Sequence, residues 1–187
     1  QIEPSWEFHV VEGESHFLEQ QICDGLVDVG LFPTPIYSQD LESYPVLDEQ
    51  ILLAISVENK KAIAIADSLM TGDGIREIAP FGAFPFILLR EGLKLRTLVN
   101  RLCQAECFVP KAVIGSETLD SCRSLVEDDY GITFLPSTLN SKGDDDKVKF
   151  YPLASKLCFR QLVLVARSDR AKRFHLSEVA HIMQQFL

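Results

Sequence analysis

The stretch 10–32 constrains the fold more than any other part of the sequence. It reads as an apolar strand ending near residue 11, a short helix capped by Ser15 and stopped by Gly25, and a second apolar strand over 26–32. No hairpin turn joins the two strands. A strand, a helix and a strand in this order predict a βαβ unit, whose strands are parallel.

Ligands of parallel α/β sheets bind beyond the carboxyl ends of the strands, where helix N-termini point. This rule places the turns 12–16 and 33–36 on the binding edge. Ser15 fits a plain helix cap, and it also fits a loop whose hydroxyl and backbone N–H groups hold an anion; the two roles are compatible. The candidate contacts in this half are Glu14, Ser15, His16, Phe32, Pro33 and Thr34.

A second unit of the same kind begins at residue 84. Apolar runs and helical spacings predict, in order, a strand over 84–89, a helix over 95–103, a strand over 112–114, a helix over 119–126 and a strand over 132–135. The residues that follow its first two strands are the candidate contacts of this half: Arg90, Ser116, Glu117 and Thr118. Arg90 fits either an anion contact or a surface arginine, and Ser116 or Thr118 fits a helix cap.

Two apolar segments flank this second unit, at 50–57 and 161–167. If they lie side by side and antiparallel, the chain leaves the first lobe through one and returns through the other. We therefore expect an α/β protein of two Rossmann-like lobes joined by two crossover strands, with a cleft between them. The expected boundaries are lobe I at 1–58 plus 161–187, lobe II at 59–160 with an irregular connector at 59–83, and hinge strands at 51–57 and 161–167.

Composition narrows the function. A net charge of −9 disfavours direct binding of nucleic acid, which needs a basic face. No apolar run approaches the roughly 20 residues of a membrane span, and no signal peptide opens the chain. Five cysteines, an odd number, favour a reducing compartment. The chain begins at Gln1, and we expect a fragment of a longer protein.

Six landmarks in the right order resemble the effector-binding domain of LysR-type transcriptional regulators. They are Glu12-Gly13, the segment 24–31, Pro45-Val46-Leu47 before the hinge strand, the segment 84–89, Gly131 to Pro136 and the return strand 160–167. Each motif is weak alone, but together they cover nearly the whole chain. The resemblance implies the two-lobed fold of type II periplasmic binding proteins, used as a cytoplasmic sensor.

The resemblance also implies a function and partners. A small, anionic effector is expected to bind in the interlobe cleft. The conformational change that it causes is transmitted to a DNA-binding domain that this chain does not contain. The full protein is expected to be a homodimer or homotetramer that contacts DNA only through that domain, and it is not bound to a membrane. Members of the family carry an N-terminal winged helix-turn-helix and an earlier strand–helix pair, and Glu3-Pro4 replaces their usual Tyr-Pro.

Other chemistries have little support in the sequence. Cys103 and Cys107 share a helical face, but no histidine pair completes a zinc pattern, and Cys23 and Cys122 fit small core positions. We expect no catalytic residue, metal or cofactor. Three alternatives stay open: a solute-binding protein of a transporter, a small-molecule enzyme of the same fold, and a thiol switch like that of regulators that sense peroxide through a cysteine pair.

Overall fold

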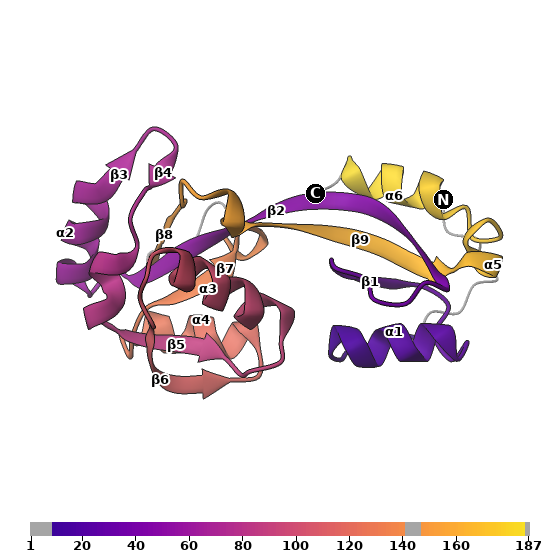
Figure 1. Ribbon diagram of the computed structural model, residues 1–187, viewed down its shortest axis with the longest axis horizontal. Coiled ribbons are helices and arrows are strands. Elements are labelled where there is room, and N and C mark those ends of the chain that lie inside the picture. The colour runs from indigo at the N-terminus through magenta and orange to yellow at the C-terminus, as the bar shows by residue number, and fades with distance from the viewer. Residues whose placement is uncertain (1–8, 141–146, 186–187) are drawn as a thin grey trace. The chain divides into compact units, whose positions relative to one another are not determined.

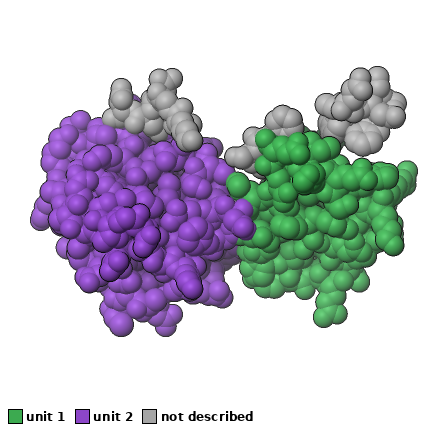
Figure 2. Space-filling view, turned by 90° about the horizontal axis from the view of Figure 1, so that it is seen from above, with its two compact units in different colours: residues 1–47, 161–187 green, residues 48–160 purple. Residues whose placement is uncertain are grey.

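The computed structural model describes residues 9–140 and 147–185 of the chain (Figure 1). Residue contacts divide it into two compact units (Figure 2). Unit 1 contains residues 1–47 and 161–187, and unit 2 contains residues 48–160. The expected lobes had the same order along the chain, but residues 48–58 lie in unit 2 instead of with the first lobe.

Unit 1 is organised around strand β9 (Phe159–Arg167), which enters it at residue 161. Strand β1 (Gly30–Pro33) pairs with β9 antiparallel, from Gly30 opposite Val165 to Pro33 opposite Leu162. Strand side chains alternate between two faces, and each face of β9 has its own apolar cluster. Val163 and Val165 pack with Ile22 of helix α1 (Ser15–Cys23), while Leu164 and Ala166 pack with Leu176 and Ala180 of helix α6 (Leu176–Gln184). The short helix α5 (Ser168–Ala171) joins β9 to α6.

The predicted βαβ unit at the start of the chain is wrong in the described residues. Residues 9–14 form no strand, and Val10 and Val11 are 84% and 48% exposed. Without a neighbouring strand, their N–H and C=O groups have no ladder to join. The second strand is confirmed in part, as β1, but its partner β9 runs antiparallel. Gly25 does end α1 as predicted, with φ +75°.

Unit 2 holds most of the remaining elements. Strand β5 (Pro85–Leu89) and strand β6 (Lys111–Ser116) are parallel, as predicted, and helix α3 (Lys94–Ala105) connects them. Helix α4 (Leu119–Glu127) follows β6 and leads to strand β7 (Thr133–Pro136). Three short 3-10 helices also occur among the described residues: η1 (Ala79–Ala83), η2 (Ser137–Leu139) and η3 (Lys156–Cys158).

Strand β2 (Leu41–Ser56) is 16 residues long and belongs to both units, with residues 41–47 in unit 1 and 48–56 in unit 2. Its residues 51–54 pair antiparallel with β7, and its residues 53–56 pair antiparallel with strand β8 (Val148–Tyr151). β7 was expected to extend the parallel sheet; only a bridge between Phe86 and Ile132 runs parallel there.

The predicted hinge pairing needs a correction in its position. β9 does lie next to β2 in the hydrogen-bonded order β1-β9-β2-β7. However, residues 53 and 54 of β2 already have β7 on one side and β8 on the other. A strand has only two edges, so β9 cannot pair with residues 53 and 54, which lie inside the expected segment 51–57.

The expected irregular connector is also wrong. Residues 60–69 form helix α2 (Lys60–Leu69), which buries Ala62 and Ala66 completely. Asn59 caps it, because its side-chain oxygen accepts a hydrogen bond from the Ala62 N–H. Strands β3 (Met70–Thr71) and β4 (Gly74–Ile75) then form a small hairpin. This helix was missed because its buried residues are alanines, which do not stand out as a stripe of large apolar side chains. Alanine nevertheless has the highest helix propensity.

Candidate functional site

The strongest cluster of predicted site residues lies at the carboxyl ends of β5 and β6. Leu89 is opposite Ser116 in the parallel register, so the two strands end at the same level. The backbone N–H of Arg90 donates to the Ser116 carbonyl at 2.8 Å. Arg90, Ser116, Glu117 and Thr118 were all predicted from the sequence, and the structure brings these four together.

Thr118 is the cap of α4, as predicted. Its Oγ1 accepts a hydrogen bond from the Ser121 N–H at 3.2 Å and donates one to the Ser121 hydroxyl at 2.8 Å. The Ser116 hydroxyl accepts from the Thr118 N–H at 3.3 Å and donates to the Thr118 carbonyl at 3.1 Å. These bonds fix the turn at the positive end of the α4 dipole, which favours a negative charge.

Charge at this edge is mixed. The Arg90 Nε lies 3.9 Å from the Glu117 Oε1, and their side chains are 47% and 81% exposed. Ser116, by contrast, is buried. The edge therefore offers an anionic ligand the exposed guanidinium of Arg90 and the N-terminus of α4. The carboxylate of Glu117 competes with such a ligand for Arg90.

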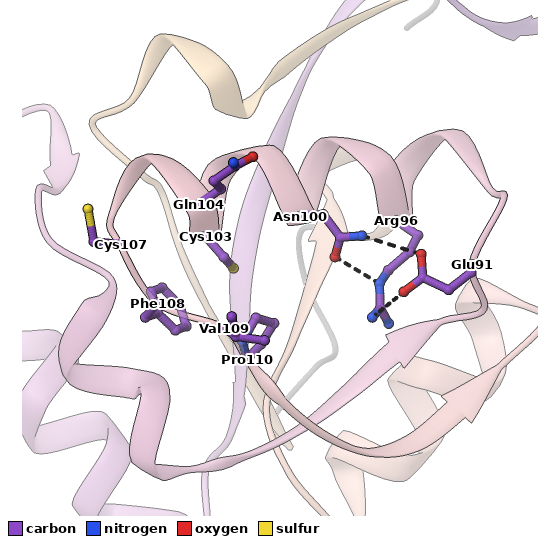
Figure 3. Close-up of a pocket in the computed structure, with 9 residues that line it drawn as sticks. All are labelled: Glu91, Arg96, Asn100, Cys103, Gln104, Cys107, Phe108, Val109 and Pro110. Atoms are coloured by element: carbon purple, nitrogen blue, oxygen red, sulfur yellow. Dashed lines mark hydrogen bonds and ion pairs between the residues drawn. The ribbon is translucent and has the colours of Figure 1, made fainter.

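Arg96 positions the turn that carries Arg90, and the sequence argument missed it. Its guanidinium donates from Nη1 to the Leu89 carbonyl at 3.1 Å. Figure 3 shows its two other contacts: Nε donates to Asn100 Oδ1 at 2.9 Å, and Nη2 is 2.7 Å from Glu91 Oε1. The spacing of Arg96 and Asn100, four residues apart on a helix, was the available signal.

The predicted site residues of unit 1 lie in two places, at the start of α1 and at the end of β1. Glu14, and not Ser15, is the cap residue of α1, because its backbone is extended and its carbonyl accepts from the Leu18 N–H; Ser15 and His16 are the first helical residues. Phe32 is buried in the unit 1 core. Pro33 and Thr34 follow it, and the Thr34 N–H donates to the Gln161 carbonyl.

Glu19, a second residue that the sequence argument missed, holds the loop after β1. It is a buried carboxylate on α1, and its Oε2 accepts a hydrogen bond from the Tyr37 N–H at 2.9 Å. No sequence pattern signalled this contact, because the partner is a backbone group 18 residues away. Glu19 therefore ties Tyr37, directly after the predicted turn 33–36, to the helix that begins at Ser15.

A separate pocket of about 310 Å³ lies against α3 in unit 2. Its lining residues come from the turn before α3, from α3 itself and from the loop after it. Figure 3 shows them: Glu91, Arg96, Asn100, Cys103, Gln104, Cys107, Phe108, Val109 and Pro110. Burial raises the pKa of the Cys103 thiol to about 12, so that the thiol stays neutral at physiological pH. The guanidinium of Arg96 is already engaged by Glu91, Asn100 and Leu89, so this pocket offers an anion little.

The described residues hold no cluster of three or more histidine, cysteine, aspartate or glutamate side chains that could bind a metal ion. Within the same residues, no helix is both long and apolar enough to cross a membrane. The Glu3-Pro4 landmark lies outside the described residues.

Comparison with known sequences identifies relatives over nearly the whole chain. The family profile described as the LysR substrate binding domain matches residues 3–187. The uncharacterized HTH-type transcriptional regulator YcgK of Bacillus subtilis is 28% identical over an alignment of 176 residues, and the alignment covers 89% of this chain and 54% of that protein. The hydrogen peroxide-inducible genes activator of Haemophilus influenzae is 23% identical over 178 residues, 95% of this chain and 56% of that protein. The chain thus spans about half the length of these relatives.

Solved structures show the same fold. The effector binding domain of a BenM variant superposes with a TM-score of 0.75 at 13% identity, covering 93% of this chain and 79% of that one. The Corynebacterium glutamicum OxyR C206 mutant gives a TM-score of 0.73 at 22% identity, covering 97% of this chain and 55% of that one. At these identities the likeness concerns the fold alone.

Proposed function

This chain belongs to the LysR substrate-binding domain family, and from that premise we propose that it senses a small anionic effector through the residues at the ends of β5 and β6. The observation that carries the proposal is the grouping of Arg90, Ser116 and Thr118 where two parallel strands end at one level and α4 begins. A guanidinium and a helix N-terminus both favour a carboxylate or phosphate group.

The proposal also assigns effector-binding residues to unit 1. Its contribution comes from the start of α1, at Glu14, Ser15 and His16, and from the end of β1, at Pro33 and Thr34. Glu19 keeps these two segments in a fixed relation, since it joins α1 to the loop after β1. Phe32 acts from the core, as support for that loop.

In the whole protein, the effector changes the equilibrium between two states of this domain, and a DNA-binding domain reads the change. The relatives named HTH-type transcriptional regulators, which are about twice as long as this chain, support that arrangement. A ligand can do this only if it binds one state more tightly than the other. The proposal includes a cytoplasmic homodimer or homotetramer that binds and releases its effector without converting it.

A thermal-shift screen of small carboxylates and phosphates tests this function. A true effector raises the melting temperature, because it binds the folded state only. The variant Arg90→Gln should lose the shift, while Arg101→Gln, which removes an exposed arginine from α3 with the same change in charge, should keep it. A panel with no stabilising compound, or a hit that Arg90→Gln leaves unaffected, contradicts the proposal. Loss of the compound on incubation would instead indicate an enzyme.

A further inference from the structure

Glu49 is the most deeply buried acidic side chain of unit 2 among the described residues, with 1% of it exposed. Its Oε2 lies 2.5 Å from Nε of Arg160, whose side chain is 12% exposed. Its other oxygen accepts a hydrogen bond from the Thr138 hydroxyl, at the start of the segment after β7. Both carboxylate oxygens are therefore engaged, each by a different part of the chain.

The pair occupies a special place along the chain. Glu49 is the second residue of unit 2 on β2, and Arg160 is the last residue of unit 2 on β9. These are the two strands through which the chain passes between its units. The neighbouring Gln50 adds a second tie, because its Nε2 donates to the Leu153 carbonyl at 3.1 Å.

Stability alone does not explain a buried ion pair. The cost of removing two charges from water commonly equals or exceeds their attraction, so a well-packed apolar pair of the same size is as good or better. Removing only one partner is costly, because the other charge stays buried and unpaired. A buried ion pair adds a penalty for misalignment, because a shift of either partner leaves two charges buried and unpaired.

The apolar pattern of β9 leaves its own alignment poorly specified. Val163 to Ala166 are four consecutive buried apolar residues, with Val163 and Val165 in one cluster of unit 1 and Leu164 and Ala166 in another. A strand that alternates apolar and polar residues resists a slip, because a shift by one residue moves its apolar set to the wrong face. Strands that are apolar on both faces lack this safeguard.

We propose that Glu49, Arg160 and Thr138 form a register lock, which selects one alignment of β2 and β9 where both strands leave unit 2. Any slip of either strand separates the carboxylate from the guanidinium and leaves both charges buried. This inference does not depend on the identity of an effector, and it holds whether or not the proposed function is correct.

The test separates alignment from stability. Amide hydrogen exchange is followed in residues 41–56 and 159–167, with β5 and β6 as an internal reference, in Glu49→Leu, Arg160→Met and the double variant. Each single variant should have a lower melting temperature and exchange about 100-fold faster or more in these two segments. The double variant should regain most of the melting temperature but keep the fast exchange relative to β5 and β6.

Two controls complete the design. Arg170→Met removes an exposed pair with Asp28, whose side chains are 33% and 63% exposed, and should change neither readout. Glu49→Gln keeps the shape of the side chain, and its exchange rates decide the matter if the leucine variant fails to fold. The register lock is overturned if amide hydrogen exchange in residues 41–56 and 159–167 of the double variant is as slow as in the wild type. Where Glu49→Gln is used in its place, the same result in that variant overturns it. An unchanged melting temperature in both single variants overturns it as well.

Discussion

The Arg90 Nε lies 3.9 Å from the Glu117 Oε1 at the ends of two parallel strands, and both side chains are open to water. An exposed pair of this kind contributes about 0–1 kcal/mol, so that an anionic ligand can take the place of Glu117 beside Arg90 at small cost. We predict that Glu117→Gln strengthens the binding of an anionic effector several-fold and Glu117→Asp changes it less. Isothermal titration measures both; weaker binding by Glu117→Gln would show that Glu117 is itself a ligand contact.

The cap of α4 gives a stability prediction. Thr118→Ala removes the oxygen that accepts from the Ser121 N–H, which should lower the free energy of unfolding by about 1 kcal/mol. Thr118→Ser keeps the oxygen and should stay within about 0.5 kcal/mol of wild type. Denaturant unfolding decides between them, and an equal loss in both variants would mean that the threonine methyl group, not the cap, is what matters.

Two glycines of the β3–β4 hairpin form a matched pair. Gly74 has φ +117°, and a Cβ there would lie 2.6 Å from the Pro152 carbonyl oxygen. Gly74→Ala should therefore destabilise the protein by more than about 1 kcal/mol. A Cβ at Gly72 meets nothing within 4 Å, so Gly72→Ala should stay within about 0.5 kcal/mol of wild type. Similar unfolding curves for the two variants would contradict this reading of the hairpin.

The carboxylate of Asp67 should make the stability of the folded protein depend on pH. The Tyr151 hydroxyl donates to Asp67 Oδ1 at 2.8 Å, and this bond, supported by Lys149, holds the pKa of Asp67 below its usual 3.8. A carboxyl group whose pKa is lower in the folded state stabilises that state above its unfolded pKa, and the gain is lost as the pH falls through its folded pKa. The wild-type protein should melt above Asp67→Asn at neutral pH, and the difference should shrink below pH 3.8. A difference independent of pH would exclude the charge as its cause.

The cysteines of the α3 pocket should differ in reactivity. Cys107 is exposed, while Cys103 is buried with a pKa raised to about 12, and thiolates are the reactive form. Iodoacetamide at neutral pH should label Cys107 in the folded protein and leave Cys103 unlabelled, as mass spectrometry can establish. Cys107→Ser should abolish that label. A Cys103–Cys107 disulfide after mild peroxide treatment would instead favour the thiol-switch alternative.

The sequence was a good guide wherever a local pattern decided the structure. The βαβ order over 84–135 predicted that β5 and β6 are parallel, and this alone brought Arg90 near Ser116. Thr118 was predictable as a cap because threonine before an amphipathic stretch satisfies helix N–H groups. The family landmarks then implied the two-lobed fold that the solved structures share.

Other features depend on contacts that no local pattern encodes. Glu49 and Arg160 are 111 residues apart, and in the sequence each is an ordinary charged residue beside an apolar run. Phe32 was expected at a binding surface, but β1 turns it toward Ile22 and the unit 1 core. Strand formation at 8–11 fails in the described part of that segment, because a strand needs a partner that apolar residues alone do not supply.

The most direct test of effector binding is a titration of the isotope-labelled protein with the anion that stabilises it best, followed through backbone amide chemical shifts. Binding at the proposed site predicts the largest changes at Arg90 and at residues 116–118, and changes at residues 14–16 and 33–34 that follow the same dissociation constant. Changes confined to residues 103–110 of the α3 pocket would contradict it.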